Sequence, residues 1–378
     1  MIDRRLRVGV NLLWLVPGDV GGSEDYAVAL MRELGRLDEL ELVLFCQPEL
    51  PSHHPDLASA ATIVPGPRRG RTRGARVVWE NVWLPQQLRR AGVDVVHHVG
   101  GTLPPTSTRR PALTVYDLQP LLHPERFGAA KRLWLRTVLP RSVRRAGVIF
   151  TLSEHVRRRL VSHLAVPSDR VVAVSPGATE IHMHRPSDIA SVRRRYGLTG
   201  DILVFPAISY PHKNHEVLVR ALPMVLHQCP EATMVFTGRR GPSDDQLDVL
   251  AWSLGVDRAV RRLGRVDRAD LEALYATASA LVFPSTYEGF GLPLLEAMGH
   301  GCPILAANAS AIPEVVGDGG RLIDPADPRA WADAIIRVLR DPAERAALSD
   351  AASRSAKRYR WDDSIPAVLS AYRKLAAG

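Results

Sequence analysis

The chain has 378 residues, of which 46% are apolar and 24% charged, the composition of a soluble globular protein of about two domains. The formal net charge of +9 favours anionic ligands or surfaces, but no nucleic-acid-binding motif of the usual kinds is present, so we expect no nucleic-acid partner. No apolar run reaches the roughly 18 residues of a membrane-spanning helix. Cys46, Cys229 and Cys302 lie far apart without metal or redox spacing, which predicts buried or partly buried thiols in a reducing compartment.

Short apolar runs alternate with amphipathic stretches through the first half of the chain. Residues 6–16 could belong to a signal peptide, but they lack a small-residue cleavage site and lead into a glycine-rich turn, so a first buried strand explains them better. Further strands are predicted at 41–46, 93–99, 111–117 and 147–153, and helices at 23–37, 77–92 and from Glu154 onward, with Ser153 as the helix cap. Strands that alternate with such helices indicate βαβ units and a parallel sheet.

The same alternation begins again after a Pro- and Gly-rich stretch at 176–187. Strands are predicted at 201–208, 231–238, 279–285 and 302–307, and helices at 187–197, 215–229, 268–278, 291–301 and 327–341. We therefore predict an α/β protein of two Rossmann-like, doubly wound parallel-sheet domains, at 1–180 and 187–358, that face a central cleft. In such sheets ligands bind outside the carboxyl ends of the strands, so we expect chemistry in the loops that follow strands.

Two of these loops suit an anion. Gly21 and Gly22 lead into a helix, where backbone N–H groups and the helix dipole favour negative charge; the alternative is an ordinary capped turn. Lys213, in PHKNHE just before a helix, can neutralise phosphate oxygens; the alternative is a solvated helix start. A zinc site at the flanking His212 and His215 would need more converging ligands.

The loop YDLQPLLHPERF, residues 116–127, follows a strand of the first half. Asp117 and His123 would face the cleft and touch donor or acceptor. The alternative is that they form loop-stabilising hydrogen bonds.

Basic residues concentrate in two stretches that contain no acid. Residues 66–76 hold five arginines, and residues 131–145 hold six basic residues interleaved with Leu, Val and Trp134. Such surfaces attract lipid head groups or phosphorylated substrates. The alternative is a solvated arginine-rich face.

The loop and helix FPSTYEGFGLPLLEAMGHGCPI, residues 283–304, carry the most chemistry. Glu288 follows a buried strand in a loop with Gly289 and Gly291, whose N–H groups can meet a diphosphate, and its carboxylate can reach sugar hydroxyls. Glu296 lies about one turn into the next helix, and its two acceptor oxygens suit the vicinal hydroxyls of a ribose. A solvent-facing glutamate would fit badly among the apolar neighbours at 294–298.

The segment YEGFGLPLLEAMGHGCPI resembles the E-x7-E region of glycosyltransferase family 4, a large retaining family with the GT-B fold. Other segments are similar to its successive signatures in order and spacing: GGSE, TVYDLQPLLHPERF, TLSEHVRRRL, VVAVSPGA, PHKNHEVLVRAL, LGRVDRADLEALYATASALVFPS and ASAIPEVVGDGGRLIDPAD. The resemblance covers roughly residues 7–375 and is most specific at 263–325. It implies a GT-B fold in which 361–378 form a helix that crosses back to the N-terminal domain.

The resemblance also implies a role for each matching position. Glu288 would contact the donor sugar near its reacting centre, Glu296 would hold the ribose, and Lys213 would pair with the diphosphate. Gly21 and Gly22 would meet the diphosphate from the other domain. The backbone that would close on phosphate and sugar is that of Phe290, Gly291 and Leu292.

The sequence departs from the family pattern at two places. Many members carry His-Asp where this chain has Tyr116 and Asp117, and that histidine usually touches the donor sugar. Many also place an arginine a few residues before the lysine, where this chain has 207–210, Ala-Ile-Ser-Tyr. Neutralisation of the diphosphate would then rest on Lys213 and helix N-termini, or on Arg239 or Arg240.

The leaving group of such a reaction is a nucleoside diphosphate, so preformed positive groups at its terminal phosphate lower the barrier most. The resemblance implies retention of configuration, and we expect a front-side displacement in which the departing phosphate accepts the acceptor's proton. We name Glu288, Lys213 and Asp117 as catalytic candidates, although Glu288 is the only visible nucleophile for a double displacement. Because the chain contains no Asp-x-Asp, we predict no metal and no cofactor.

These observations predict a hexosyltransferase that moves a sugar from a nucleotide-sugar donor to a glycan, glycolipid or polyprenyl-linked acceptor. PHKNHE suggests GDP-mannose, and UDP- and dTDP-sugars remain open. Without a spanning segment or a signal peptide, we expect a soluble, cytoplasmic protein. The basic stretch 131–145 suggests an acceptor at an anionic membrane surface, which would place the protein at the inner face of the membrane. The alternatives are another GT-B enzyme, a phosphorylase or nucleotide-sugar epimerase, and a non-catalytic protein that binds anionic surfaces.

Overall fold

The computed structural model describes residues 5–19, 21–67, 73–107, 111–123, 128–178 and 186–378. The chain divides into two compact units, an N-terminal unit of Met1–Gly177 with Arg360–Gly378 and a C-terminal unit of Ala178–Tyr359. Residues 179–185 of the predicted linker and residues 68–72 of the arginine-rich stretch 66–76 lie outside the described residues. No helix in the described part of the chain is long and apolar enough to cross a membrane.

The described part of the N-terminal unit contains a seven-stranded sheet in the order β3-β2-β1-β4-β5-β6-β7. Its strands are β1 (Leu6–Leu12), β2 (Leu40–Cys46), β3 (Thr62–Pro65), β4 (Val95–His98), β5 (Ala112–Val115), β6 (Val148–Thr151) and β7 (Val171–Ala173). Each neighbouring pair is parallel. The inner strands are nearly continuously buried, as expected for a sheet that is covered on both faces.

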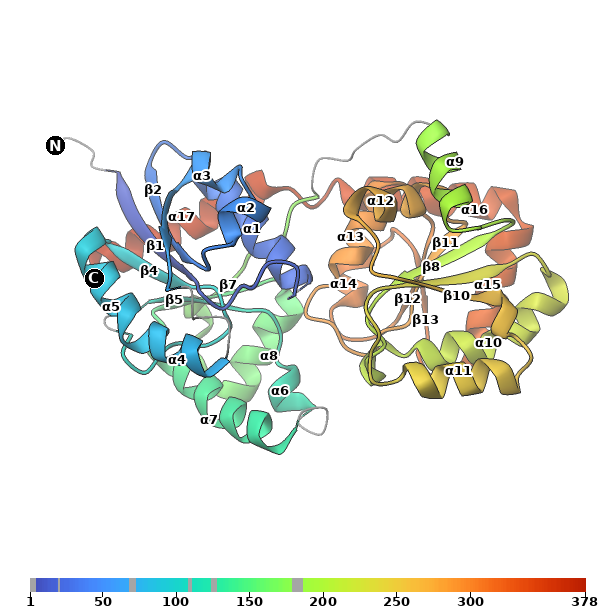
Figure 1. Ribbon diagram of the computed structural model, residues 1–378, viewed down its shortest axis with the longest axis horizontal. Helices are drawn as coiled ribbons and strands as arrows, with labels where there is room; N and C mark the ends of the chain where they lie inside the picture. Colours follow the sequence, from blue (N-terminus) through green and yellow to red (C-terminus); the bar gives the residue numbers. More distant parts are fainter. Residues whose placement is uncertain (1–4, 20, 68–72, 108–110, 124–127, 179–185) are drawn as a thin grey trace. The chain divides into compact units, whose positions relative to one another are not determined.

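Helices cover both faces of this sheet (Figure 1). They are α1 (Gly22–Gly35), α2 (Leu50–His53), α3 (Leu57–Ala60), α4 (Arg73–Asn81), α5 (Trp83–Ala91), α6 (Gln119–Leu122), α7 (Ala129–Arg145), α8 (Glu154–Leu164), the short η2 (Ser168–Arg170) and α17 (Trp361–Ala377). Ser153 caps α8 as predicted, because its hydroxyl accepts from Val156 N at 3.2 Å.

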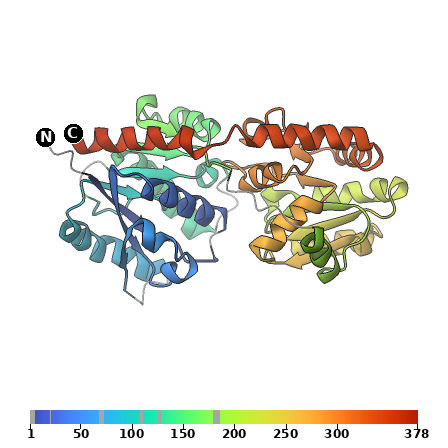
Figure 2. The ribbon, with the colours of Figure 1, turned by 90° about the horizontal axis from the view of Figure 1, so that it is seen from above.

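The last helix, α17, belongs to the N-terminal unit although it comes from the end of the chain (Figure 2). Tyr372 is fully buried, and its hydroxyl lies 2.7 Å from His97 Nδ1 in β4. At the start of the helix, Ser364 Oγ donates to Ser175 O at 2.8 Å. Trp361 packs so closely on Gly177 that a Cβ there would lie 2.6 Å from its ring.

The prediction of a single helix at 77–92 was wrong, because the structure has two helices, α4 and α5, on either side of Val82. Pro85 gives the reason. Its nitrogen carries no hydrogen, so it cannot donate to the carbonyl of Asn81, and a continuous helix would lose that bond and crowd the ring.

The described part of the C-terminal unit has a six-stranded sheet in the order β10-β9-β8-β11-β12-β13, again with parallel neighbours. The strands are β8 (Ile202–Pro206), β9 (Thr233–Thr237), β10 (Val260–Gly264), β11 (Ala280–Phe283), β12 (Ile304–Ala307) and β13 (Arg321–Ile323). The helices are α9 (Pro186–Arg195), η3 (Pro211–Lys213), α10 (His215–Gln228), α11 (Asp244–Ser253), η4 (Asp257–Ala259), α12 (Arg268–Thr277), α13 (Leu292–Gly299), α14 (Ile312–Val316), α15 (Pro328–Arg340) and α16 (Pro342–Ala356).

Both strand orders are those of doubly wound sheets, so the prediction of two Rossmann-like parallel-sheet domains is confirmed. The order reverses between β1 and β4 in one unit and between β8 and β11 in the other. Loops diverge from the carboxyl edge at such a point and leave room for a ligand. In the C-terminal unit, this places the loops after β8 and β11 in a ligand-binding position.

Candidate active site

Lys213 and Glu288 meet at the carboxyl edge of the C-terminal sheet. Lys213 ends η3, which follows β8, and Glu288 lies in the loop after the neighbouring strand β11. Lys213 Nζ donates to Glu288 Oε1 at 2.6 Å, and the two side chains are 22% and 12% exposed. A positive and a negative group are thus held together at the point where this sheet type binds ligands.

Hydrogen bonds tie together the two loops that carry this pair. Asn214 adopts a left-handed conformation with φ 57°, and its Nδ2 donates to Pro284 O at 3.3 Å and to Pro325 O at 2.8 Å. Thr286 N donates to His212 O at 2.8 Å. These bonds fix the distance between the loops, so the ion pair sits on a preformed frame.

Ser310 holds the backbone of Glu288, and Gly291 starts the helix that follows. Ser310 Oγ accepts from Glu288 N at 3.2 Å and donates to Glu288 O at 2.7 Å. Gly291 has φ 98°, a conformation that side chains rarely adopt, and a Cβ there would lie 3.0 Å from Leu294 Cδ1. The helix α13 begins directly after it, so the amides of its first turn lie at the same edge.

Glu296 lies within α13, and its carboxylate is held by two residues that sequence reasoning did not single out. Arg268 Nη1 donates to Oε1 at 2.6 Å, and Tyr275 Oη donates to Oε2 at 3.0 Å. The Glu296 side chain is only 12% exposed, so it does not project freely into solvent. No local pattern reveals these partners, which stand 28 and 21 residues away in the sequence.

His215 belongs to the core of the C-terminal unit. Its ring lies 4.5 Å from the ring of Phe205 and 4.8 Å from that of Phe236, between centroids. Burial, reinforced by the charge of Arg262, lowers the pKa of His215 to about 3, so the imidazole is neutral at physiological pH. The ring of His212, by contrast, stacks on that of Tyr210.

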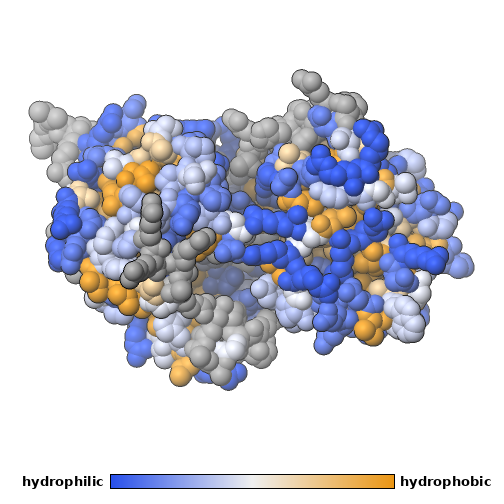
Figure 3. Space-filling model, in the orientation of Figure 1, coloured by the Kyte–Doolittle hydropathy of each residue, from blue (hydrophilic) through white to orange (hydrophobic). Residues whose placement is uncertain are grey.

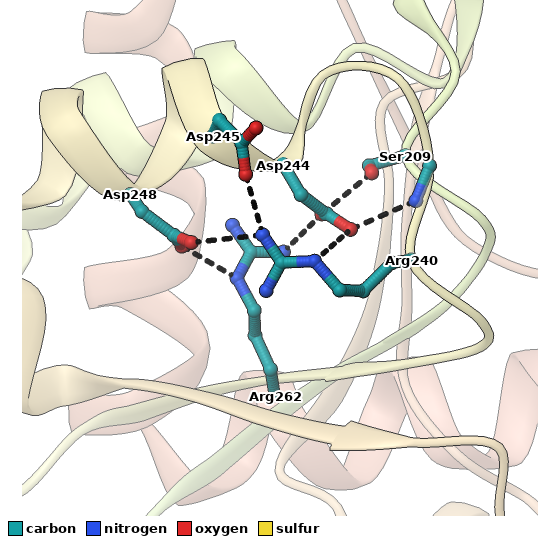
Figure 4. Close-up of polar contacts among 7 residues, drawn as sticks. Ser209, Arg240, Asp244, Asp245, Asp248 and Arg262 are labelled. Atoms are coloured by element: carbon teal, nitrogen blue, oxygen red, sulfur yellow. Dashed lines mark hydrogen bonds and ion pairs between the residues drawn. The ribbon is translucent and has the colours of Figure 1, made fainter.

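Arg240 is engaged by acids, which weighs against the prediction that it substitutes for the missing family arginine (Figure 4). Its Nη2 donates to Asp245 at 2.7 Å and to Asp248 at 3.5 Å, and its Nε lies 3.9 Å from Asp244. Arg262 makes a second pairing, with Nη1 2.8 Å from Asp244 Oδ1. The guanidinium of Arg240 is therefore already paired. The carboxylates that surround it would also repel a diphosphate.

Asp244 joins the loops that follow β8 and β9. Its buried carboxylate accepts from Ser209 Oγ at 2.6 Å and from Gly241 N at 2.8 Å (Figure 4). Gly241 approaches Ser209 so closely that a Cβ would lie 2.8 Å from its backbone. Ser209 therefore serves to anchor its loop, where many family members have a phosphate-binding arginine nearby.

In the N-terminal unit, Gly21 and Gly22 begin α1 as predicted. Gly21 has φ 68°, and Glu24 and Asp25 lie in the first turn of the helix. The Glu24 carboxylate is already occupied, since it accepts from Gly18 N at 2.8 Å and lies 2.9 Å from His54 Nε2. A helix start of this kind favours negative charge, but the acidic residues in its first turn reduce that positive potential.

Tyr116 and Asp117 follow β5, and His123 ends the short helix α6. Tyr116 Oη donates to Ser23 O at 3.4 Å, and its ring lies 5.9 Å from that of Trp14. Burial and the nearby Tyr26 raise the pKa of Tyr116 well above its usual range, so its hydroxyl stays protonated. Asp117 Oδ1 accepts from Gln119 N at 2.9 Å. This bond stabilises the loop, as the alternative to a contact with donor or acceptor predicts for this residue.

A buried polar chain that the sequence did not reveal lies at the ends of β1 and β4. Asn11 Nδ2 lies 3.2 Å from Glu80 Oε1 and 3.1 Å from His98 Nδ1, and His98 Nε2 lies 3.2 Å from Ser107 Oγ. Because Asn11 donates to Nδ1, the proton of neutral His98 is on Nε2. Burial, and then the charge of Arg145, lowers the pKa of His98 to about 3. Glu80, His98 and Ser107 line a cavity of about 1230 Å³ in this unit.

Comparison with known proteins agrees with this architecture. Residues 192–355 match the model of the family described as glycosyl transferases group 1, and residues 20–179 match that of glycosyltransferase family 4. In the search of solved structures, sucrose-phosphate synthase from Thermosynechococcus elongatus aligns with a TM-score of 0.78 at 20% identity, over 99% of this chain and 100% of that one. Anabaena HepE in complex with UDP and glucose aligns with a TM-score of 0.76 at 19% identity, over 97% and 99%.

Two curated relatives are similar in sequence. The O-antigen chain mannosyltransferase B of Escherichia coli is 31% identical over 292 residues, 75% of each chain. The D-inositol 3-phosphate glycosyltransferase of Nocardioides sp. is 34% identical over 238 residues, 58% of this chain and 52% of that relative, so this alignment spans about half of the relative's length.

The family matches and the 31% identical relative, together with the two doubly wound units, define a glycosyltransferase of the GT-B type. Within that class the chain belongs to glycosyltransferase family 4, the group 1 glycosyltransferases.

Proposed function

We propose that this chain is a retaining hexosyltransferase that moves a sugar from a nucleotide-sugar donor to a glycan, glycolipid or polyprenyl-linked acceptor. The observation that carries the proposal is the Lys213–Glu288 pair at the carboxyl edge of the C-terminal sheet, next to the switch in strand order, with Glu296 in the helix α13 that follows Glu288. GDP-mannose is the first donor to test, because one relative is named a mannosyltransferase. UDP-glucose is the second, because a solved neighbour holds UDP and glucose.

Each member of the group has a chemical task in this proposal. Lys213 neutralises the diphosphate, the backbone amides of Phe290, Gly291 and Leu292 add hydrogen bonds, and Glu296 accepts from the ribose hydroxyls. In the absence of a donor, Glu288 satisfies the charge of Lys213. A bound diphosphate takes the place of that carboxylate and releases Glu288 to accept from hydroxyls of the donor sugar.

The reaction needs stabilisation of the leaving group more than it needs a base. As the glycosidic bond breaks, negative charge grows on the diphosphate, and a positive group fixed beforehand at that place lowers the barrier. The proposal is a front-side displacement in which the departing phosphate oxygen takes the proton of the acceptor hydroxyl. Glu288 is assigned to sugar binding and not to covalent catalysis. The residues present hold the diphosphate without a metal or cofactor in this proposal.

The N-terminal unit supplies further candidates. Gly21 and Gly22 open an anion-binding helix start. Tyr116, Asp117 and His123 follow β5 and are proposed to contact sugar hydroxyls of donor or acceptor.

We also propose that α7 brings the enzyme to an anionic membrane, where a lipid-linked acceptor would lie. Leu133 and Trp134 are 68% and 43% exposed, and the arginines on both sides of them, Arg132 and Arg136, are exposed. The sequence of this helix contains no acid. On its visible face the N-terminal unit shows hydrophobic patches set among hydrophilic residues (Figure 3). Apolar contact combined with positive charge is what peripheral binding to anionic lipid requires.

Donor binding and turnover test the main proposal. The enzyme is heated with GDP-mannose, UDP-glucose or dTDP-glucose in saturating amount, and its melting temperature is followed. A ligand at 100 times its Kd stabilises the folded state by about 2.7 kcal/mol. The stabilising donor is then incubated with a polyprenyl-linked sugar, and the anomeric configuration of the product is read by NMR. Retention is expected; inversion, or a melting temperature that no donor raises, would contradict the proposal.

A further inference from the structure

The carboxylate of Glu296 is held from one side by helix α12. Arg268 Nη1 donates to Oε1 at 2.6 Å, and Tyr275 Oη donates to Oε2 at 3.0 Å. Among the described residues, these are the side chains that donate to this carboxylate, one to each oxygen. The orientation of the carboxyl plane is therefore fixed by two donors on a neighbouring helix.

Tyr275 is a permanent donor. It is fully buried, and burial together with the charge of Glu296 raises the pKa of its phenol well above the usual range. The hydroxyl has one proton, and that proton is directed at Glu296 Oε2. The ring of His300 stacks against the tyrosine ring with centroids 6.1 Å apart, which limits rotation of the side chain.

Arg268 is fixed as well, because its guanidinium bridges two carboxylates. Nε donates to Glu272 Oε1 at 2.7 Å while Nη1 donates to Glu296. The Glu272 side chain is only 7% exposed, so it anchors the arginine at the protein surface. Arg268 offsets the negative charge of both glutamates and fixes the position of Glu296 Oε1.

The remaining hydrogen-bonding capacity of Glu296 matches a vicinal diol. A carboxylate offers about four lone-pair positions, two on each oxygen. One position on each oxygen is taken by α12, which leaves one on each for a ligand. A ribose presents two neighbouring hydroxyls, whereas a 2′-deoxyribose presents one.

We propose that Tyr275 and Arg268 are positioning residues that aim Glu296 at both ribose hydroxyls, so that the site selects ribonucleotide over 2′-deoxyribonucleotide donors. This inference rests on the proposed donor site and narrows its substrate class to GDP-, UDP- or ADP-type sugars against dTDP-sugars. The competing explanation is that the two bonds only brace α12 against α13. The two explanations differ in how removal of the tyrosine hydroxyl should change the affinity for ligands with and without a 2′-hydroxyl.

The test compares ligand pairs on matched variants. Calorimetry gives the Kd of GDP and 2′-deoxy-GDP, and of UDP and 2′-deoxy-UDP, for the wild type, Tyr275→Phe, Arg268→Gln and Glu296→Ala. Tyr196→Phe is the control, because its hydroxyl also donates to a carboxylate of the same unit, Asp270 Oδ2 at 2.6 Å. Circular dichroism and a melting curve establish that each variant is folded.

The wild type should prefer the ribonucleotide by roughly 10- to 150-fold, the value of one charge-assisted hydrogen bond. Tyr275→Phe should reduce this preference by at least about threefold, mainly because it weakens the binding of the ribonucleotide. Tyr196→Phe should leave the preference unchanged. Arg268→Gln should reduce it too and serves as the decisive variant if Tyr275→Phe does not fold.

If Tyr275→Phe, or Arg268→Gln in its place, weakens the binding of the ribonucleotide and of its 2′-deoxy partner equally, the inference is overturned and the bracing role is established. A preference that survives Glu296→Ala would instead overturn the ribose assignment in the proposed function. If neither pair binds the wild type, the proposed donor site fails and the inference fails with it.

Discussion

Lys213 and Glu288 are 75 residues apart in the sequence, yet Nζ of the lysine donates to Oε1 of the glutamate at 2.6 Å. The pair joins the loops after β8 and β11, the adjacent strands at which the order of the C-terminal sheet reverses. In a donor-free enzyme, the carboxylate occupies the lysine that the leaving diphosphate would need. In the proposed mechanism, the pair keeps the lysine in place until the diphosphate of a donor replaces the carboxylate.

Replacing Lys213 by alanine should weaken the binding of nucleoside diphosphates by roughly 10- to 150-fold, because a charge-assisted contact is lost. Binding of the unphosphorylated nucleoside should change little. Calorimetry measures both, and Lys357→Ala, an exposed lysine of the same unit, is the control. Unchanged diphosphate affinity in folded Lys213→Ala would remove the lysine from the donor site.

Turnover should survive removal of divalent ions. The chain has no Asp-x-Asp, and the proposed site balances the diphosphate with Lys213 and helix amides. The rate of sugar transfer is measured before and after EDTA treatment and after Mg²⁺ or Mn²⁺ is restored. A large loss that either ion reverses would refute the metal-free mechanism.

Acidification should destabilise the N-terminal unit. Burial lowers the pKa of His97 and of His98 to about 3, whereas a histidine in the unfolded chain has a pKa of about 6.5. Between these values the unfolded state binds more protons. The contribution of the two histidines to the free energy of unfolding is therefore fully present above pH 6.5 and is lost as the pH drops toward 3. The slope is up to about 1.4 kcal/mol per pH unit for each histidine.

Urea denaturation at pH 7.5, 6.5 and 5.5 measures this slope. His97→Gln should reduce it, because one of the two neutral buried rings is gone, whereas the exposed His163→Gln should not. A slope that is the same in wild type and His97→Gln would show that His97 does not contribute.

The basic helix α7 should bind anionic vesicles. In flotation, the wild type should rise with phosphatidylglycerol vesicles and remain behind with phosphatidylcholine vesicles, because apolar contact and charge act together. Leu133→Ser with Trp134→Ser should abolish flotation. The matched control is Val249→Ser with Trp252→Ser on α11, where exposures are 67% and 75% but acids surround the patch. Equal recovery of wild type with both kinds of vesicle would reject the membrane proposal.

Much of the fold could be predicted from the sequence because its signals are local. Buried strands such as β8 and β11 are continuous apolar runs, and Pro or Gly residues mark the turns between elements. The strands β3, β7, β10 and β13 were not predicted. Each has three to five residues and includes partly exposed positions, so none carries a strong apolar pattern. Their pairing to an existing sheet, a long-range effect, decides their structure.

The candidate site divides in the same way. The spacing of Glu288 and Glu296 around Gly289 and Gly291 is a local pattern that can be recognised in the sequence. The partners of these glutamates were not, because Lys213, Arg268 and Tyr275 reach them through the fold across long sequence separations. The suggestion that Arg240 replaces a family arginine came from order in the sequence alone, and three aspartates around it weigh against that suggestion.

The most direct measurement of the central claim is donor affinity in Glu296→Ala. Calorimetric titration with the nucleoside diphosphate that binds the wild type should show a loss of roughly 10- to 150-fold, since charge-assisted bonds to the ribose are removed. Glu216→Ala, which breaks a surface pair with Arg220 in the same unit, should bind like the wild type. Wild-type affinity in a folded Glu296→Ala protein would contradict the assignment of this site to a nucleotide-sugar donor.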